Sequence, residues 1–203
     1  MLRIQQWVCA GLILAAAAVN CAAQSTGTPV FQAPYRAFGR SEIGISLSDP
    51  GSGFALEGSV RGGISPTTDL GVRGGFRSFS GRNSETDVLL GVDLRVRMGT
   101  HSESFPLDIS GTVGLGLESG HGFTTGRLPL GLSMGRRLRV EGSGISLVPY
   151  VQPVLTFFFG DASGSDLSFG FGLDARMNRR LDLRVSAAVG DMNGVGFTVA
   201  FLH

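Results

Sequence analysis

The sequence predicts an all-β protein: a closed antiparallel up-and-down transmembrane β-barrel of about ten strands, with eight strands as the alternative. Three observations predict this class. Apolar and polar residues alternate with a period of two from residue 42 onward, and nearly every ionic residue in the strands falls on one phase. No stretch after residue 23 is long and apolar enough for a membrane helix, which needs ~20 apolar residues.

Residues 1–23 have the pattern of a secretory signal peptide. Arg3 supplies a positive start, residues 8–19 form an apolar run too short to span a bilayer, and Cys21-Ala22-Ala23 offers small residues for cleavage before Gln24. The alternative is a lipoprotein signal with Cys21 as the lipidated residue, but Asn20 stands where such sites prefer a small residue. Both cysteines lie in this segment, so the mature chain would have no disulfide and no thiolate metal site.

The rest of the chain is divided into a lead-in and a single barrel domain. We expect residues 24–34 to be a flexible N-terminal lead-in and residues 35–203 to form the transmembrane barrel. Polar turn residues such as Asp49-Pro50-Gly51 separate the alternating stretches. The predicted strands cover residues 42–47, 54–64, 70–77, 87–98, 107–118, 127–135, 145–159, 167–177, 181–190 and 195–201.

Two features qualify this pattern. Pro149 and Pro153 cannot donate to a β-ladder, so we expect a bulge in the strand over residues 145–159. Aromatic residues are expected to form two interface belts. One would lie near the outer strand ends and the other, including Tyr150 and Phe201, near the periplasmic ends.

Charged residues of both signs share the phase that would face the lumen of a membrane barrel. In a barrel of eight to ten strands the interior is largely filled by side chains, and buried charges must be paired, so we expect a plug of ion pairs rather than an open conduit. Glycines on the same phase would leave room for large charged neighbours. The predicted lumen-facing charges are Glu57, Arg61, Arg73, Arg77, Asp87, Asp93, Arg95, Arg97, Asp108, Glu118, Arg127, Asp174, Arg176, Asp182 and Arg184.

The segment GLDARMNRRLDLRVSAAVGD is similar to the strand–turn–strand near the end of small bacterial outer-membrane β-barrels, and GVGFTVAF resembles their C-terminal strand. From about Tyr35 onward the chain therefore resembles the OmpA/OmpX-like superfamily, barrel domain only. The resemblance implies that the barrel-assembly machinery recognises a C-terminal signal made of Val195, Phe197, Val199 and Phe201. Leu202 and His203 depart from the pattern, because the family usually ends on an aromatic residue.

Few residues suggest chemistry. The net charge of +1 gives no electrostatic case for nucleic-acid binding. The stretches 118–121 and 101–103 combine Glu, Ser and His, but adjacency in sequence does not give catalytic geometry. The acidic residues within 161–166 are read as a solvated loop, and the sequence predicts no cofactor, no metal and no catalytic residue.

We therefore expect an integral protein of the bacterial outer membrane, exported by its signal peptide, with a structural or minor permeability role and no enzymatic activity. Its expected partners are outer-membrane lipids, lipopolysaccharide and the barrel-assembly machinery. The alternatives are a lipid-modifying barrel enzyme of the outer membrane and a secreted or periplasmic soluble β-protein.

Overall fold

The computed structural model describes residues 25–34, 40–51, 53–79, 86–120 and 122–203. The predicted signal peptide, Gln24 and Tyr35 lie outside the described residues. Nothing helical in the described part of the chain has the length and apolarity of a membrane-spanning helix.

Ten strands of 8 to 15 residues and one very short strand follow each other along the chain. Their limits lie within a few residues of the predicted ones, because the alternation ends wherever turn residues begin. The strands are β1 (Glu42–Asp49), β2 (Gly53–Ser65), β3 (Thr68–Phe79), β4 (Thr86–Gly99), β5 (Asp108–Gly120), β6 (Phe123–Gly135), β7 (Leu138–Arg139), β8 (Ser146–Gly160), β9 (Gly164–Arg176), β10 (Leu181–Gly190) and β11 (Gly194–Leu202).

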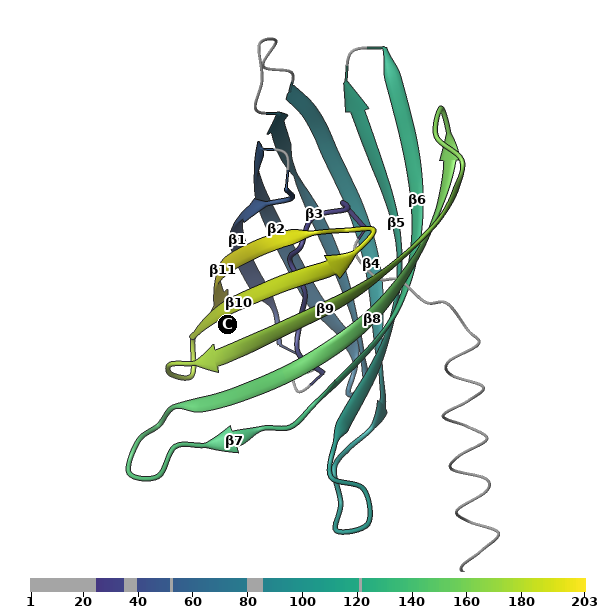
Figure 1. The fold of residues 1–203 in the computed structure, drawn as a ribbon. Helices are drawn as coiled ribbons and strands as arrows, with labels where there is room; N and C mark the ends of the chain where they lie inside the picture. The colour runs from purple at the N-terminus through teal and green to yellow at the C-terminus, as the bar shows by residue number, and fades with distance from the viewer. Residues whose placement is uncertain (1–24, 35–39, 52, 80–85, 121) are drawn as a thin grey trace, which may run out of the picture.

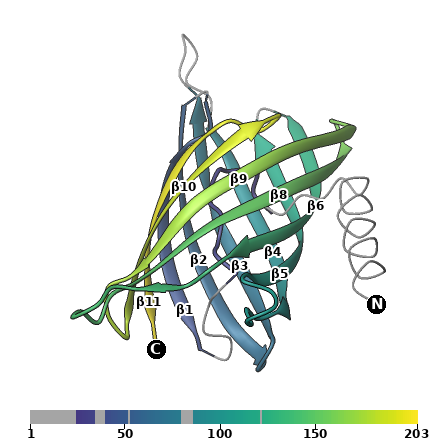
Figure 2. The same ribbon diagram turned by 60° about the horizontal axis from the view of Figure 1, so that its bottom comes forward.

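The ten long strands form a closed barrel in which each pairs with its neighbours in antiparallel fashion (Figures 1 and 2). Two pairings complete the ring: β1 pairs with β11, and β6 pairs with β8. The two-residue β7 pairs only with β8 and does not interrupt the ring. The predicted fold class and the predicted count of ten strands are confirmed.

The barrel has two unlike ends. We call the end where Glu42 pairs with Leu202 the terminal end, and the opposite end the distal end. The distal end holds short turns such as residues 161–163 and 191–193. The terminal end holds the longer connections 100–107 and 136–145 as well as the turn at 177–180.

The prolines of β8 do not have the effect we expected. A bulge was predicted at Pro149 and Pro153, but β8, all of whose residues are described, keeps one register with β9 and one with β6. Pairing to β6 is skipped at Pro153 and Gln152 and then resumes in the same register. A proline therefore interrupts the ladder on one side without adding a residue, and the register shifts lie elsewhere, at Gly63–Ser65 and Arg97–Gly99.

The polarity of the barrel is the inverse of a soluble protein. The large side chains that strands present to the exterior are apolar, such as Ile45 at 61% exposed and Val60 at 57%, whereas Glu57 and Arg61 on the same strand as Val60 are 2% and 4% exposed. The alternation thus places an apolar surface outside the ring and a charged, tightly filled lumen inside it.

Residues 25–34, which we name the lumen segment, lie inside the ring of strands; their trace is purple in Figures 1 and 2. All but Gln32, which is half-buried, are buried. The expectation of a flexible lead-in over residues 24–34 is therefore corrected for residues 25–34. The segment is short and carries no charged side chain, and its backbone groups find partners on the lumen wall rather than in water.

Candidate functional site

The lumen collects the charges that the sequence placed on one phase of the strands. Nine of the fifteen predicted residues are buried, namely Glu57, Arg61, Arg73, Asp93, Arg95, Asp108, Glu118, Asp182 and Arg184. The other six are half-buried, namely Arg77, Asp87, Arg97, Arg127, Asp174 and Arg176.

The first group of ion pairs is centred on Asp69, which is fully buried at the start of β3. Its two carboxylate oxygens accept hydrogen bonds from Arg61 at 2.6 Å and from Arg95 at 2.5 Å. Arg61 also donates to Asp93, and Arg95 donates to the carbonyl of Ala33 at 3.0 Å. Two guanidiniums and two carboxylates thus satisfy one another across β2, β3 and β4, as buried charges require.

The second group lies toward the distal end and is centred on Glu118 of β5. Arg77 donates to one of its carboxylate oxygens at 2.8 Å, and Arg127 donates to the other. The same two arginines hold the lumen segment, because Arg77 donates to the carbonyl of Gly27 at 2.8 Å and Arg127 to that of Thr26 at 3.3 Å.

The third group lies toward the terminal end and is centred on Arg184 of β10. It makes a bidentate pair with Glu42 of β1 at 2.8 and 2.5 Å, across the intervening strand β11. Asp174 of β9 lies 3.3 Å from the Nε atom of Arg184, and Arg176 makes a bidentate pair with Asp182 at 2.8 and 2.9 Å. Planar guanidinium–carboxylate pairs of this kind fix geometry as well as charge.

Sequence reasoning missed Glu42 and Asp69 as lumen charges. Asp69 was assigned to a turn, yet it has the same parity as Arg73 in β3, and Glu42 has the same parity as Ser46 in β1. Extending the third predicted strand by one residue would have found Asp69, whereas Glu42 already lay on the polar phase of the predicted strand 42–47 and was left out of the list of lumen charges. The lumen segment carries no comparable signal, because it is not a strand and has no period.

Glycines on the lumen wall provide the space that the lumen segment occupies. A Cβ atom at Gly116 would overlap the carbonyl group of Ser25. A Cβ at Gly196 would lie 2.6 Å from the carbonyl oxygen of Pro29, and one at Gly170 would lie 2.7 Å from the ring of Phe31. The expected role for lumen glycines, room for charged neighbours, holds at Gly71, where a Cβ would lie 2.6 Å from the Cζ of Arg61. The lumen segment was the unforeseen occupant.

Hydrogen bonds fix the lumen segment along its length. Thr28 donates to Glu57 at 2.5 Å, and the hydroxyl of Ser186 donates to the carbonyl of Pro29 at 2.6 Å. Ser133 donates to the carbonyl of Gln32 at 2.9 Å. Ala33 donates its N–H to Asp174 at 3.2 Å.

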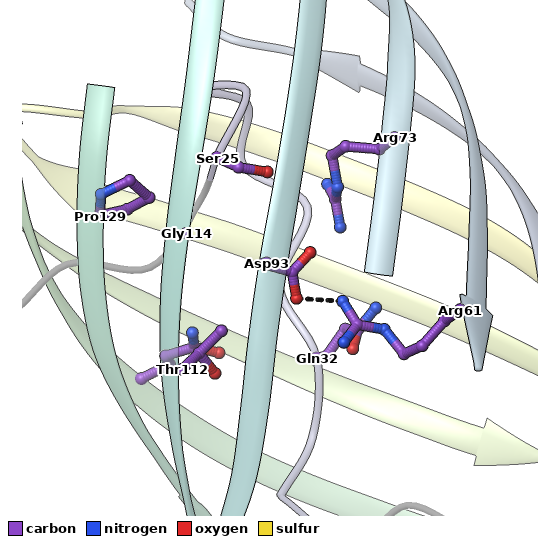
Figure 3. A pocket seen from close by; sticks show the side chains of 9 residues that line it. Ser25, Gln32, Arg61, Arg73, Asp93, Thr112, Gly114 and Pro129 are labelled. Carbon is purple, nitrogen blue, oxygen red and sulfur yellow. Dashed lines mark hydrogen bonds and ion pairs between the residues drawn. The ribbon is translucent and has the colours of Figure 1, made fainter. Parts of the chain in front are cut away.

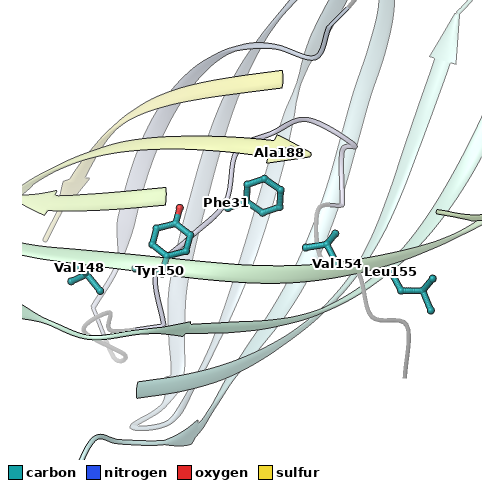
Figure 4. Packing of buried hydrophobic residues seen from close by; sticks show 7 residues of the cluster. Phe31, Val148, Tyr150, Val154, Leu155 and Ala188 are labelled. Atoms are coloured by element: carbon teal, nitrogen blue, oxygen red, sulfur yellow. The ribbon is translucent and has the colours of Figure 1, made fainter. Parts of the chain in front are cut away.

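An apolar contact supports the middle of the lumen segment. Phe31 is fully buried beside Val148, Tyr150 and Val154 of β8 and Ala188 of β10 (Figure 4). These side chains form an apolar patch on the lumen wall, and they give the phenyl ring a dry surface. Tyr150 is therefore an interior residue and does not belong to the predicted aromatic belt.

Little space is left around the lumen segment at the centre of the barrel. A cavity of about 20 Å³ lies between the segment and the wall, lined by Ser25, Gln32, Arg61 and Asp93 among others (Figure 3). That volume holds about one water molecule. Larger cavities lie beyond the two ends of the segment, about 200 Å³ beside Gly27 and about 570 Å³ beside Pro34.

The remaining sequence predictions have mixed outcomes. His121 lies outside the described residues. His101 lies at the terminal end and contacts Asp108, with its Nδ1 atom 3.1 Å from a carboxylate oxygen. Within the described ranges, no group of three or more His, Cys, Asp or Glu residues could hold a metal ion. Of the predicted C-terminal signal, Val195, Phe197 and Phe201 are exposed on the outer surface of β11, and Val199 is half-exposed there.

No protein-family model matches the chain, and no curated protein matches it. Solved structures of similar architecture include the beta domain of the Bordetella autotransporter BrkA, with 15% identity, a TM-score of 0.46, and coverage of 83% of this chain and 99% of that one. The N-terminal β-barrel domain of Pseudomonas aeruginosa OprF has 12% identity and a TM-score of 0.37, covering 83% and 100%. Acinetobacter baumannii Omp33 has 8% identity and a TM-score of 0.39, with the same coverage. Such low values leave the function of this chain to be argued from its own residues.

Proposed function

We propose that the chain is an integral β-barrel protein of the bacterial outer membrane, with a structural role and at most a minor permeability. The observation that carries this proposal is the inverted polarity of a closed ring of strands. Isolated from lipid, the ring would expose rows of Ile, Val, Leu and Phe side chains to water. A closed barrel has no open edge strand, so it does not present a row of unpaired backbone groups to lipid.

The lumen supports the structural role over a transport role. Three groups of ion pairs and the lumen segment fill the interior, and about 20 Å³ remains beside the segment at mid-barrel. A hydrated ion needs a continuous water path, which these contacts interrupt. We therefore propose that the intact barrel conducts poorly, and we assign it no catalytic role.

The orientation follows from the predicted signal peptide. Export by the predicted signal peptide would deliver the chain to the periplasm, and β1 begins at the terminal end, so we orient the terminal end toward the periplasm and the distal end toward the outside. The exposed residues Val195, Phe197 and Phe201 of β11 would then be available to the barrel-assembly machinery, and lipopolysaccharide would surround the distal half.

Cell fractionation tests the proposal. The protein should be recovered in the outer-membrane fraction, require detergent for extraction and migrate differently on SDS gels before and after boiling. Release by salt alone, with no change of migration on heating, would contradict it and favour a soluble β-protein. A change in lipopolysaccharide composition on expression would instead favour the lipid-modifying enzyme.

A further inference from the structure

The terminal end of the barrel contains an open cavity of about 570 Å³ that the structural role does not use. Five arginines line it: Arg40, Arg97, Arg137, Arg176 and Arg179. We propose that this cavity is a binding site for a small multivalent anion, one that carries several phosphate or carboxylate groups. The inference goes beyond the membrane role and does not depend on it, because binding is a property of the folded barrel itself.

The five guanidinium groups reach the cavity from separate parts of the fold. Arg97 is in β4 and Arg176 is the last residue of β9. Arg40 precedes β1, Arg137 lies between β6 and β7, and Arg179 is in the turn between β9 and β10. The convergence of five distant positions is a property of the closed barrel, which brings the terminal ends of these strands into one ring.

Negative charge among the lining residues is scarce. Asp108 is the one carboxylate in the set that lines the cavity, and it already accepts a hydrogen bond from the backbone N–H of His101 at 3.0 Å. Arg176 is paired with Asp182, and the lining residues include five arginines and one carboxylate. A concave surface lined by one sign of charge concentrates the field and raises the local concentration of ions of opposite sign.

The distribution of charge along the barrel makes this excess specific to one end. The whole chain carries a net charge of only +1. Among the described residues of the distal end, Asp49 at the end of β1 and Asp161 and Asp191 in turns are acidic, and each accepts a hydrogen bond from a nearby backbone N–H. A generally basic protein would show no such contrast, so the arginines mark the terminal end as the anion-binding face.

The chemistry of the lining residues selects the ligand. Guanidinium groups bind phosphate and carboxylate through paired N–H donors, and several of them suit an anion with more than one such group. Thr100 and Asn178 add neutral hydrogen-bonding groups to the lining. The volume lies within the usual range of small-ligand sites, about 300–1,000 Å³. Arg40 also donates to the carbonyl of Arg179 at 3.2 Å, which holds two of the arginines near each other before any ligand binds.

Titration calorimetry on the purified, folded full chain in neutral detergent tests the site, with tripolyphosphate and citrate as separate probes. The first variant is the double substitution Arg40→Gln with Arg179→Gln, two exposed side chains that line the cavity. Its matched control is Arg139→Gln with Arg180→Gln, which removes the same charge from two exposed arginines of the same end that do not line the cavity. Heat-dependent gel migration verifies that each variant is folded.

The proposal expects about one probe molecule bound per chain. Affinity should fall about tenfold or more in the cavity variant and stay within about twofold of the original in the control, because the cavity variant loses two charged hydrogen-bond donors of the site. The probe with the higher affinity identifies phosphate or carboxylate as the recognised group. Absence of saturable binding of both probes would overturn the proposal. An equal loss in the two double variants would also overturn it, since binding would then reflect the general charge of that end.

Discussion

The carbonyl group of Ser25 occupies the position where any residue other than glycine at 116 would place its Cβ atom. A Cβ atom at Gly91, on the neighbouring strand β4, would likewise lie too close to the side chain of Ser25, whose Oγ atom is the nearest. These contacts make the lumen segment part of the barrel, because the wall is shaped to its backbone at β5 and β11 and to its side chains at β4 and β9.

Substitution of Gly116 should expel the lumen segment while leaving the barrel closed. In a Gly116→Val background, a cysteine introduced as Thr28→Cys should react rapidly with a maleimide, because the segment can no longer seat against β5. In the unsubstituted background the same cysteine should react slowly, since Thr28 is fully buried. Gly58→Val is the matched control, because the nearest atom to a Cβ at Gly58 is 4.0 Å away. Rapid labelling in all three backgrounds would show that the segment does not occupy the lumen, and slow labelling in all three would show that Gly116→Val does not expel it.

Removing the charge of Asp69 should destabilise the barrel. Asp69→Asn deprives two buried arginines, Arg61 and Arg95, of a carboxylate that both contact. Loss of one member of a buried ion pair costs about 3–5 kcal/mol. Urea unfolding in lipid vesicles, followed by the heat-dependent gel shift, measures the loss, with the exposed Glu103→Gln as a control expected to change little. Equal urea midpoints for Asp69→Asn and Glu103→Gln would contradict the pairing of Asp69 with Arg61 and Arg95.

A charged side chain on the outer surface should destabilise the barrel more at the middle of a strand than at a strand end. Val60 and Ile64 both project outward from β2 and are 57% and 63% exposed, with Ile64 beside the terminal-end turn. We expect Val60→Arg to lower the free energy of unfolding by about 2–4 kcal/mol and Ile64→Arg by about 0–1 kcal/mol, as for lipid-facing residues at the midplane and the interface. If these positions faced water, neither substitution would lower the free energy of unfolding. Unchanged free energies for both variants in the vesicle unfolding assay would therefore contradict a lipid-facing surface.

The C-terminal strand should affect assembly in cells more than stability. Phe201 is 57% exposed on β11 and is the residue of the predicted recognition signal nearest to the C-terminus. Phe201→Ser should lower the amount of folded protein in the outer membrane severalfold, while the purified chain refolds into detergent nearly as well as the original. A matched decrease in both measurements would indicate a loss of stability rather than of recognition.

The alternation of residues predicted about ten strands and the phase of the ionic side chains, because successive residues of a barrel strand face lipid and lumen in turn. Closure was predicted separately, because backbone groups in lipid need hydrogen-bond partners. Strand ends were less certain, which is why Asp69 was placed in a turn. The effect of Pro149 and Pro153 was misjudged because a proline removes one donor without requiring an extra residue. Residues 25–34 have no periodicity, and their burial depends on glycines more than 60 residues away, such as Gly91 and Gly116. No local pattern could reveal that contact.

The most direct test is the conductance of the purified barrel in a planar bilayer, compared between the full mature chain and a variant lacking residues 25–34. The lumen segment occupies the centre of the barrel, and the cavity beside it there measures about 20 Å³. The account predicts rare, small openings for the mature chain and steady, larger conductance for the deletion variant, with both shown to be folded by heat-dependent migration. If the mature chain conducted as steadily and as strongly as the deletion variant, the proposal that the lumen segment blocks the barrel would be contradicted.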